Sequence, residues 1–325
     1  MKFWQDAQTR GMVSIVIAMS LFSVQDVSIK WLSGDYPLHE VIAVRASIAA
    51  CVLAVLVVIE AGWKGFRSSY PGIHATRGML VMIANSAYFL ALAVMPLAEV
   101  LAIFYVAPLL ITALSAIFLK DEVGIRRWSA VCIGMVGVLI MVRPGSEQFT
   151  VVALLPLVGA VAYASLQVMT RKVGATDVAS AMAFYIQLAF LVTCSTMFAV
   201  AGDGSYATSS DASLQFLLRA WVWPTVGDAA LMGTVGILNA FGAYFLSQAY
   251  RSANAASIAP LEYVAMPLAI IWGFVLFADT PDGIAVAGIL LIVGSGLYTF
   301  LREAFVRRQR ARSTRVAAAE IKRVA

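Results

Sequence analysis

Two apolar stretches separated by one charged turn occupy residues 96–145, which read PLAEVLAIFYVAPLLITALSAIFLKDEVGIRRWSAVCIGMVGVLIMVRPG. The first stretch, residues 100–119, contains no Asp, Glu, Lys or Arg. A helix needs about 20 such residues to cross a hydrocarbon core about 30 Å thick. The charged turn stops this helix and a second apolar stretch follows, so the segment predicts two antiparallel membrane-spanning helices.

The same pattern runs through the whole chain. Of its 325 residues, 61% are apolar and 13% are charged, whereas soluble domains average about 45–50% and about 25%. Further windows without a charged residue cover 78–98, 148–170, 178–202, 229–250, 263–278 and 283–301. We predict an all-α membrane protein with ten transmembrane helices, at residues 11–31, 39–59, 75–95, 98–119, 128–142, 151–170, 178–201, 228–248, 254–277 and 283–301.

The positions of Lys and Arg predict the orientation, because short cytoplasmic loops carry an excess of both. With a cytoplasmic amino terminus, 19 of the 23 fall inside, three fall outside (Lys30, Arg143 and Arg219) and Arg45 lies within a span. We therefore predict a multi-pass protein of the cell (inner) membrane with both termini cytoplasmic. Eight of the inside charges belong to a tail, residues 302–325. This tail is either a polybasic patch on anionic lipid or a topology anchor, and nucleic-acid binding is not expected of it.

Several classes of protein are disfavoured by what the sequence lacks. The three cysteines, Cys51, Cys132 and Cys194, all lie inside apolar stretches and offer no disulfide framework. The two histidines, His39 and His74, have no HExxH or related spacing, and no GxSxG, GxGxxG or phosphate-loop motif is present. We expect no metal, no cofactor and no ATPase activity.

Comparison of the two halves indicates an internal duplication. Residues 23–30 read SVQDVSIK and residues 165–172 read SLQVMTRK, while YFL at 88–90 recurs at 244–246 and PL at 108–109 recurs at 267–268. These matches follow the same order, so we predict two five-helix repeats, at 8–145 and 146–301. Because five is odd, the second repeat inserts upside down. Inverted repeats around a site at the membrane midplane are typical of secondary transporters.

The segment that opened this section also resembles a known family. Residues 96–145 are similar to the EamA domain of the drug/metabolite transporter superfamily through Pro108, the Lys120-Asp121-Glu122 turn, Arg126-Arg127-Trp128, Gly134 and Gly137. A weaker second copy at 254–301 keeps Pro267, Gly288 and Gly294 but has Asp279-Thr280 where the acidic turn would end in Glu. The resemblance implies two inverted EamA repeats. The first half is most similar to the bacterial branch that includes riboflavin, S-adenosylmethionine, amino-acid and opine-type metallophore carriers.

Four ionisable residues are expected at membrane depth, where each costs about 2.5–3.5 kcal/mol and is a functional candidate. Glu262 lies about eight residues into its span, or about 12 Å along the helix. We expect it to couple protons or bind a substrate amine, unless it is a protonated carboxyl bonded to a neighbouring helix. Asp26 and Arg45 either form ion pairs, Asp26 with Lys30 or Arg45, or contact substrate. Glu99 lies close to the Pro96 turn and is either functional or interfacial.

Amides and aromatic residues recur at helical spacing around these charges. They are predicted to line a central cavity, with ordinary interhelical hydrogen bonding as the alternative: Gln25, Asn85, Tyr88, Tyr105, Tyr163, Gln167, Tyr244, Gln248 and Tyr263. Pro108, Pro260 and Pro267 are predicted hinges, because proline breaks the hydrogen-bond ladder of a helix. Glycines in the fifth and tenth spans predict close helix packing, in a scaffold or at a dimer contact. A monomer and a homodimer both stay open.

These observations favour one function. We predict a secondary-active transporter that moves a small organic metabolite by alternating access, with a proton gradient as a candidate driving force. The rings favour an aromatic or heterocyclic substrate such as riboflavin, S-adenosylmethionine or an amino acid. The alternatives are a membrane channel and a membrane-embedded lipid-modifying enzyme. The sequence does not indicate whether transport is import or export.

Overall fold

Apolar helices make up the core of the computed structural model, which describes residues 7–302 except 119, 121–123, 144–149, 174–176, 209–210, 254–257, 296, 299 and 300. Within the described residues, seven helical segments are long and apolar enough to cross a membrane. They are α1 (Ala7–Leu32), α2 (Leu38–Ala61), α3 (Pro71–Leu92), α4 (Leu97–Phe104) with α5 (Ala107–Phe118), α7 (Leu155–Val173), α8 (Ala179–Ala201) and α10 (Val226–Ser252).

Three shorter apolar helices accompany them: α6 (Ile125–Val142), α12 (Ala265–Phe277) and Gly283–Ser295. Each expected span overlaps one of these ten helical segments, so the prediction of an all-helical membrane protein is confirmed for the described residues. That all ten cross the bilayer stays a prediction. The turn at Asp121-Glu122 and residues 303–325 of the basic tail lie outside the described part of the chain.

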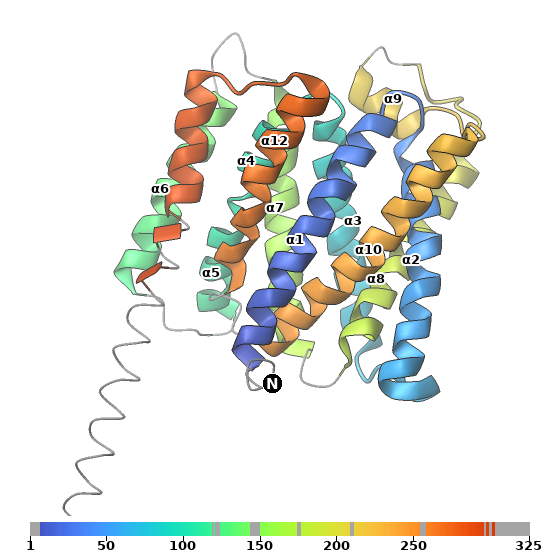
Figure 1. Ribbon diagram of the computed structural model, residues 1–325, viewed down its shortest axis with the longest axis horizontal. Helices are drawn as coiled ribbons and strands as arrows, with labels where there is room; N and C mark the ends of the chain where they lie inside the picture. Colours follow the sequence, from blue (N-terminus) through green and yellow to red (C-terminus); the bar gives the residue numbers. More distant parts are fainter. Residues whose placement is uncertain are drawn as a thin grey trace, which may run out of the picture.

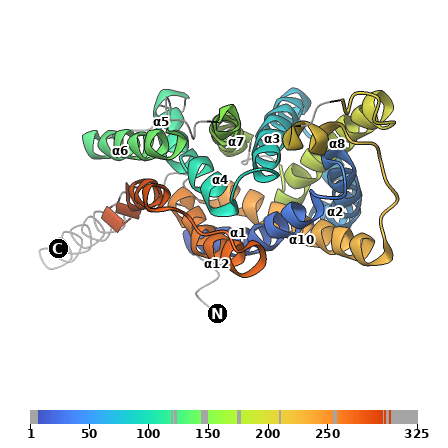
Figure 2. The ribbon, with the colours of Figure 1, turned by 90° about the horizontal axis from the view of Figure 1, so that it is seen from above.

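The helices stand side by side and form two rows (Figures 1 and 2). Seen from above, α5, α7 and α3 lie along one side, and α12, α1 and α10 lie along the other (Figure 2). The most extensive contacts join α1 with α10, α3 with α7, α2 with α8, and α2 with α10, and α4 also contacts α12. The lower row therefore brings helices from both halves of the sequence into contact.

Two of the expected spans are not single continuous α-helices. The span expected at 98–119 is divided into α4 and α5 at Tyr105 and Val106, three residues before Pro108. The nitrogen of Pro108 carries no hydrogen and cannot continue the ladder. The span expected at 254–277 contains a 3₁₀ segment, η4 (Ala259–Val264), which includes Pro260 and ends three residues before Pro267. The first four residues of that span lie outside the described part of the chain.

The helix Gly283–Ser295 packs directly against α6, as the glycine pattern predicted. A Cβ atom on Gly288 would lie 3.0 Å from the carbonyl oxygen of Gly137, so only glycine permits this approach without a shift of backbone. Beside this contact, Arg143 donates to both carboxylate oxygens of Asp282, at 2.5 and 2.6 Å. The Arg143 guanidinium holds the pKa of Asp282 below its usual value.

A short helix and its flanking loop cover one end of the bundle, at the top of Figure 1. This helix, α9 (Ala212–Leu218), begins where the Asp211 side chain accepts a bond from Leu214 N at 3.1 Å. Ser213 donates to the carbonyl of Leu90, and His39 bonds the carbonyl of Leu217. These contacts fix α9 across the ends of α2 and α3.

Candidate functional site

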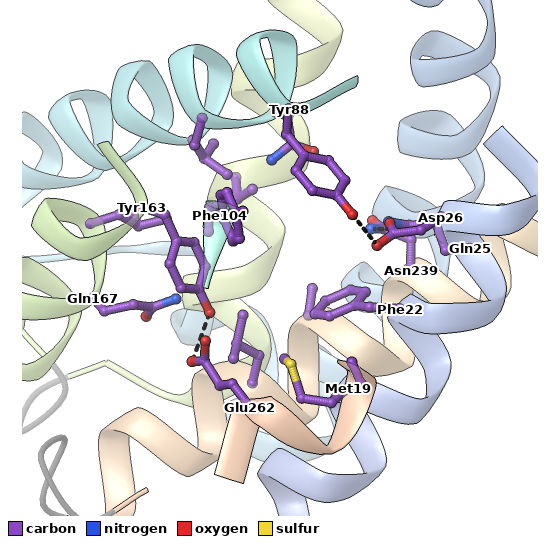
Figure 3. A pocket seen from close by; sticks show the side chains of 18 of the residues that line it. Met19, Phe22, Gln25, Asp26, Tyr88, Phe104, Tyr163, Gln167, Asn239 and Glu262 are labelled. Atoms are coloured by element: carbon purple, nitrogen blue, oxygen red, sulfur yellow. Dashed lines mark hydrogen bonds between the residues drawn. The ribbon is translucent and has the colours of Figure 1, made fainter. Parts of the chain in front are cut away.

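A cavity lies between the two rows of helices (Figure 3). About 1040 Å³ of space between atoms belongs to it, including solvent space at its open mouth. Most of its lining is apolar or aromatic. The polar and charged residues in the lining are Ser23, Gln25, Asp26, Arg77, Asn85, Tyr88, Tyr105, Tyr163, Gln167, Thr170, Gln187, Asn239, Ser247 and Glu262.

On one side of the cavity, α1 presents Asp26 to α3. The hydroxyl of Tyr88 donates to Asp26 Oδ2 at 3.0 Å. The neighbouring Gln25 is buried and accepts a bond from Asn239 Nδ2 of α10 at 2.7 Å. Figure 3 shows Tyr88 reaching Asp26 across the space between the helices. One carboxyl, one phenol and two amides from three helices therefore meet at this wall.

On the other side, η4 presents Glu262, which is 1% exposed. Its Oε1 accepts bonds from two tyrosine hydroxyls, Tyr163 of α7 at 3.0 Å and Tyr250 of α10. Among the described residues no Lys, Arg or His forms an ion pair with it. The carboxyl is thus held by hydrogen bonds from two neighbouring helices, while its side chain borders the cavity (Figure 3).

A chain of polar residues leads from the cavity to the start of α3. Arg77 is 1% exposed and donates to Thr170 Oγ1 at 3.1 Å and to His74 Nδ1 at 2.9 Å. Because arginine only donates, Nδ1 of His74 accepts, and its Nε2 donates to Asp177 Oδ2 at 2.6 Å. Ser68 donates to the same oxygen at 2.6 Å. No sequence pattern predicts this chain, because Asp177 is 103 residues from His74.

The structure does not contain the expected ion pairs of Asp26. Lys30, in the last turn of α1, forms an ion pair with Asp279 at 2.9 Å and not with Asp26. Arg45 is fully buried on α2, behind the cavity lining. Its guanidinium carbon lies 5.8 Å from the centre of the Phe89 ring and 4.9 Å from that of Phe190.

Four other predicted residues also lie outside the lining. Glu99 is half-buried near the Lys30–Asp279 and Arg143–Asp282 pairs. Tyr244 donates to Glu60 at 2.9 Å, away from the cavity, and Gln248 lies one turn further along the same helix. The residues of α10 that line the cavity are instead Asn239, Ala243, Leu246 and Ser247, so the predicted residues Tyr244 and Gln248 lie on another face of this helix.

Tyr263 lies behind the lining and contacts Tyr105. Their rings are 5.4 Å apart and nearly perpendicular. The hydroxyl of Tyr263 donates to the carbonyl oxygen of Tyr105 at 3.1 Å. This carbonyl lies in the break between α4 and α5, where Leu109 N bonds Val106 O. The two interrupted spans are therefore joined at the point where each is interrupted or irregular.

Comparisons with known proteins agree with this architecture. Residues 9–143 match the EamA-like transporter family. The chain is 25% identical over 285 residues to a riboflavin transporter of Brucella anthropi, covering 87% of this chain and 96% of that protein. It is 22% identical over 293 residues to an S-adenosylmethionine uptake transporter of Rickettsia prowazekii, covering 90% and 93%. The match over residues 9–143 and these relatives support an assignment to the drug/metabolite transporter superfamily.

Another relative is the pseudopaline exporter CntI of Pseudomonas aeruginosa. It is 26% identical over 290 residues, covering 89% of this chain and 95% of that protein. A solved crystal structure has the same fold, with a TM-score of 0.64 at 19% identity, covering 91% of this chain and 97% of that one. The family match and the names of these relatives indicate a multi-pass membrane transporter rather than an enzyme.

Proposed function

We propose that this protein is a secondary-active transporter that moves a small organic metabolite by alternating access around the central cavity. The observation that carries the proposal is the pair of cavity carboxyls, Asp26 and Glu262, each held by a tyrosine hydroxyl from another helix. Ionisable groups at this depth are expensive and mark substrate or ion pathways. The chain runs across an inner membrane with both termini in the cytoplasm.

The helix contacts support two inverted repeats, residues 8–145 and 146–301. In the two repeats α1 corresponds to α7, α2 to α8, α3 to α10, and α4 to α12. When each helix is replaced by its counterpart, the α1–α10 contact becomes the α7–α3 contact, and both contacts occur. The same exchange converts α2–α10 into α8–α3, and it leaves α2–α8 and α4–α12 unchanged; these contacts also occur. A duplicated bundle with a two-fold axis has this contact pattern, and such a bundle moves by rocking one repeat against the other.

The hinges belong to the two interrupted spans. Pro108, Pro260 and Pro267 lie in or next to irregular backbone, and interrupted helices at the midplane are typical binding elements of secondary transporters. The bond from Tyr263 to the Tyr105 carbonyl links the two interruptions, so a bend in one span is transmitted to the other. Glu262 lies in the same 3₁₀ segment, which connects protonation or substrate binding at this carboxyl to the hinge.

The substrate is an organic molecule with a planar ring. Phe22, Phe104, Tyr88 and Tyr163 surround the cavity and offer ring faces, while the amides and carboxyls orient polar groups. Relatives of similar length are named for riboflavin, S-adenosylmethionine and pseudopaline. Riboflavin and S-adenosylmethionine both carry a heterocycle, and they are the first two compounds to test.

Uptake into proteoliposomes tests both the transport and the coupling. Labelled riboflavin, S-adenosylmethionine and L-tryptophan are offered with and without an imposed pH gradient. We expect saturable uptake of one compound, accelerated by the gradient, and we expect Glu262→Gln to lose the acceleration. The matched control is Glu60→Gln, because Glu60 also accepts from a tyrosine, Tyr244, but outside the cavity. Gradient-driven uptake by Glu262→Gln at the wild-type rate removes Glu262 from coupling, and no flux of any compound contradicts the substrate class.

A further inference from the structure

One buried cation in the described part of the chain has no hydrogen-bond acceptor. Arg45 is 0% exposed, and Nε, Nη1 and Nη2 of its guanidinium all lack an acceptor among the described residues. No described carboxylate lies within ion-pair distance of it. Buried polar groups are normally paired, and an unpaired one calls for an explanation such as a missing ligand.

The two rings beside Arg45 do not supply the missing acceptors. Phe89 and Phe190 lie within the range of cation–π attraction, which favours the charge. A ring face accepts no strong hydrogen bond in the plane of the guanidinium, so the five N–H donors stay unsatisfied. A planar fork of this kind matches a carboxylate, which can accept two parallel bonds from it.

The group lies next to the cavity and is separated from it by its two aromatic neighbours. Phe89 and Phe190 both belong to the cavity lining. On the other side of Arg45, α10 comes so close that a Cβ on Gly236 would lie 3.1 Å from the Arg45 carbonyl. Asn239, one turn after Gly236, also lines the cavity. For a ligand in the cavity to reach the guanidinium, one of these two rings has to move.

Two amides in the cavity lining have oxygens without a donor in the described part of the chain. Gln187 lies one turn before Phe190 on α8 and is 1% exposed, and its Oε1 has no donor among the described residues. The Oδ1 atom of Asn239 likewise has none. Both side chains line the cavity near Asp26, whose carboxyl meets the Gln25–Asn239 pair. Amide and carboxylate oxygens of this kind accept bonds from an ammonium group.

We propose that Arg45 binds the carboxylate of a substrate with an amino-acid end, while the side-chain oxygens of Gln187, Asn239 and Asp26 accept from its ammonium group. The ring of the substrate then occupies the aromatic part of the cavity. This inference rests on the proposed transport function and narrows its substrate to zwitterionic amino acids and their conjugates. A neutral flavin does not use this subsite.

Ligand-dependent melting of the purified full-length protein tests the subsite without a transport assay. The probes are two pairs that differ only in the carboxylate: S-adenosylmethionine with its decarboxylated form, and L-tryptophan with tryptamine. A ligand that binds the folded protein raises its melting temperature by mass action. We expect at least one acid to bind, and to bind at least about tenfold more tightly than its amine partner, a difference of about 1.4 kcal/mol.

Substitution of the arginine gives the second measurement. Arg45→Gln should abolish the preference for the acid, whereas Arg219→Gln, which removes a loop arginine bonded to the Gly34 carbonyl, should keep it. Without ligand, Arg45→Gln should melt at the wild-type temperature or above, because it removes a buried charge without an acceptor. A lower melting temperature assigns the guanidinium a structural role and overturns the proposal. Equal binding of acid and amine, or binding of neither acid, overturns it as well.

The transport function is judged separately. Saturable flux of riboflavin that Arg45→Gln does not change supports a transporter and contradicts the restriction of its substrate to zwitterionic amino acids and their conjugates. Acid-selective binding through Arg45 with no flux of the bound compound supports the subsite and contradicts the transporter mechanism. The two proposals therefore fail in different experiments.

Discussion

Replacing Asp177 by Ala tests whether the polar chain at the start of α3 stabilises the protein. Asp177 Oδ2 accepts from His74 and from Ser68, and the side chains of His74 and Asp177 are only 3% and 9% exposed. The substitution leaves the buried Nε2–H of His74 without an acceptor, which costs about 1–3 kcal/mol. It also removes the negative charge nearest to the buried Arg77 along this chain. We therefore expect the free energy of unfolding to fall by about 2–4 kcal/mol.

The assay is reversible denaturant unfolding of the purified protein in micelles, followed by circular dichroism. Asp177→Asn retains one carbonyl acceptor for His74, so its loss should be clearly smaller than that of Asp177→Ala. The matched control is Asp282→Ala, which breaks an ion pair whose acid is 52% exposed and removes the acceptor of Ala285 N, so it should destabilise the protein only by the loss of one helix cap and one exposed ion pair. If Asp177→Ala is no more destabilising than Asp282→Ala, the polar chain does not hold this end of the bundle.

Three further predictions concern other contacts. Tyr263→Phe removes the bond to the Tyr105 carbonyl and should lower the unfolding free energy by about 0.6 kcal/mol while changing the exchange rate in vesicles. Gly288→Val forces side-chain atoms against the Gly137 carbonyl and should cost about 1–3 kcal/mol in the same unfolding assay. The pKa of Asp282 is lowered in the folded protein, so its ion pair stabilises the protein fully at a pH above the usual carboxyl pKa. This stabilisation is lost as the pH falls through the lowered pKa. The difference in melting temperature between wild type and Asp282→Asn should therefore shrink in acid.

The fold was predictable because hydropathy alone locates the helices. Charge-free windows identified seven of the ten apolar helical segments of the described chain, hydropathy identified the other three, and the prolines marked where two spans are irregular. The division at Tyr105 and Val106 was not predicted as a break, because a proline in an apolar run is compatible with either a bend or an interruption. Tertiary contact through Tyr263 provides a partner for the carbonyl at that break.

The site was predictable where a charge stood alone in an apolar window. Asp26 and Glu262 were found in this way, and Tyr88 and Tyr163 through their helical spacing to other polar residues. Asn239 was missed because it lies among small residues. The residues predicted on α10, Tyr244 and Gln248, lie on a different face of the helix from Asn239. The link from His74 to Asp177 joins distant segments and leaves no local pattern. Only the packing of α3 against α7 and α8 brings these residues together.

Accelerated exchange tests the central claim most directly. Proteoliposomes are loaded with an excess of the unlabelled form of the compound that binds, and the initial uptake of its labelled form is measured against empty vesicles. The binding site of an alternating-access transporter returns to the outside faster when it carries a compound from the inside. We therefore predict faster initial uptake into loaded vesicles than into empty ones, and an uptake rate that saturates as the outside concentration of the compound rises. Uptake that rises linearly and is not accelerated by internal compound would contradict alternating access and favour a channel.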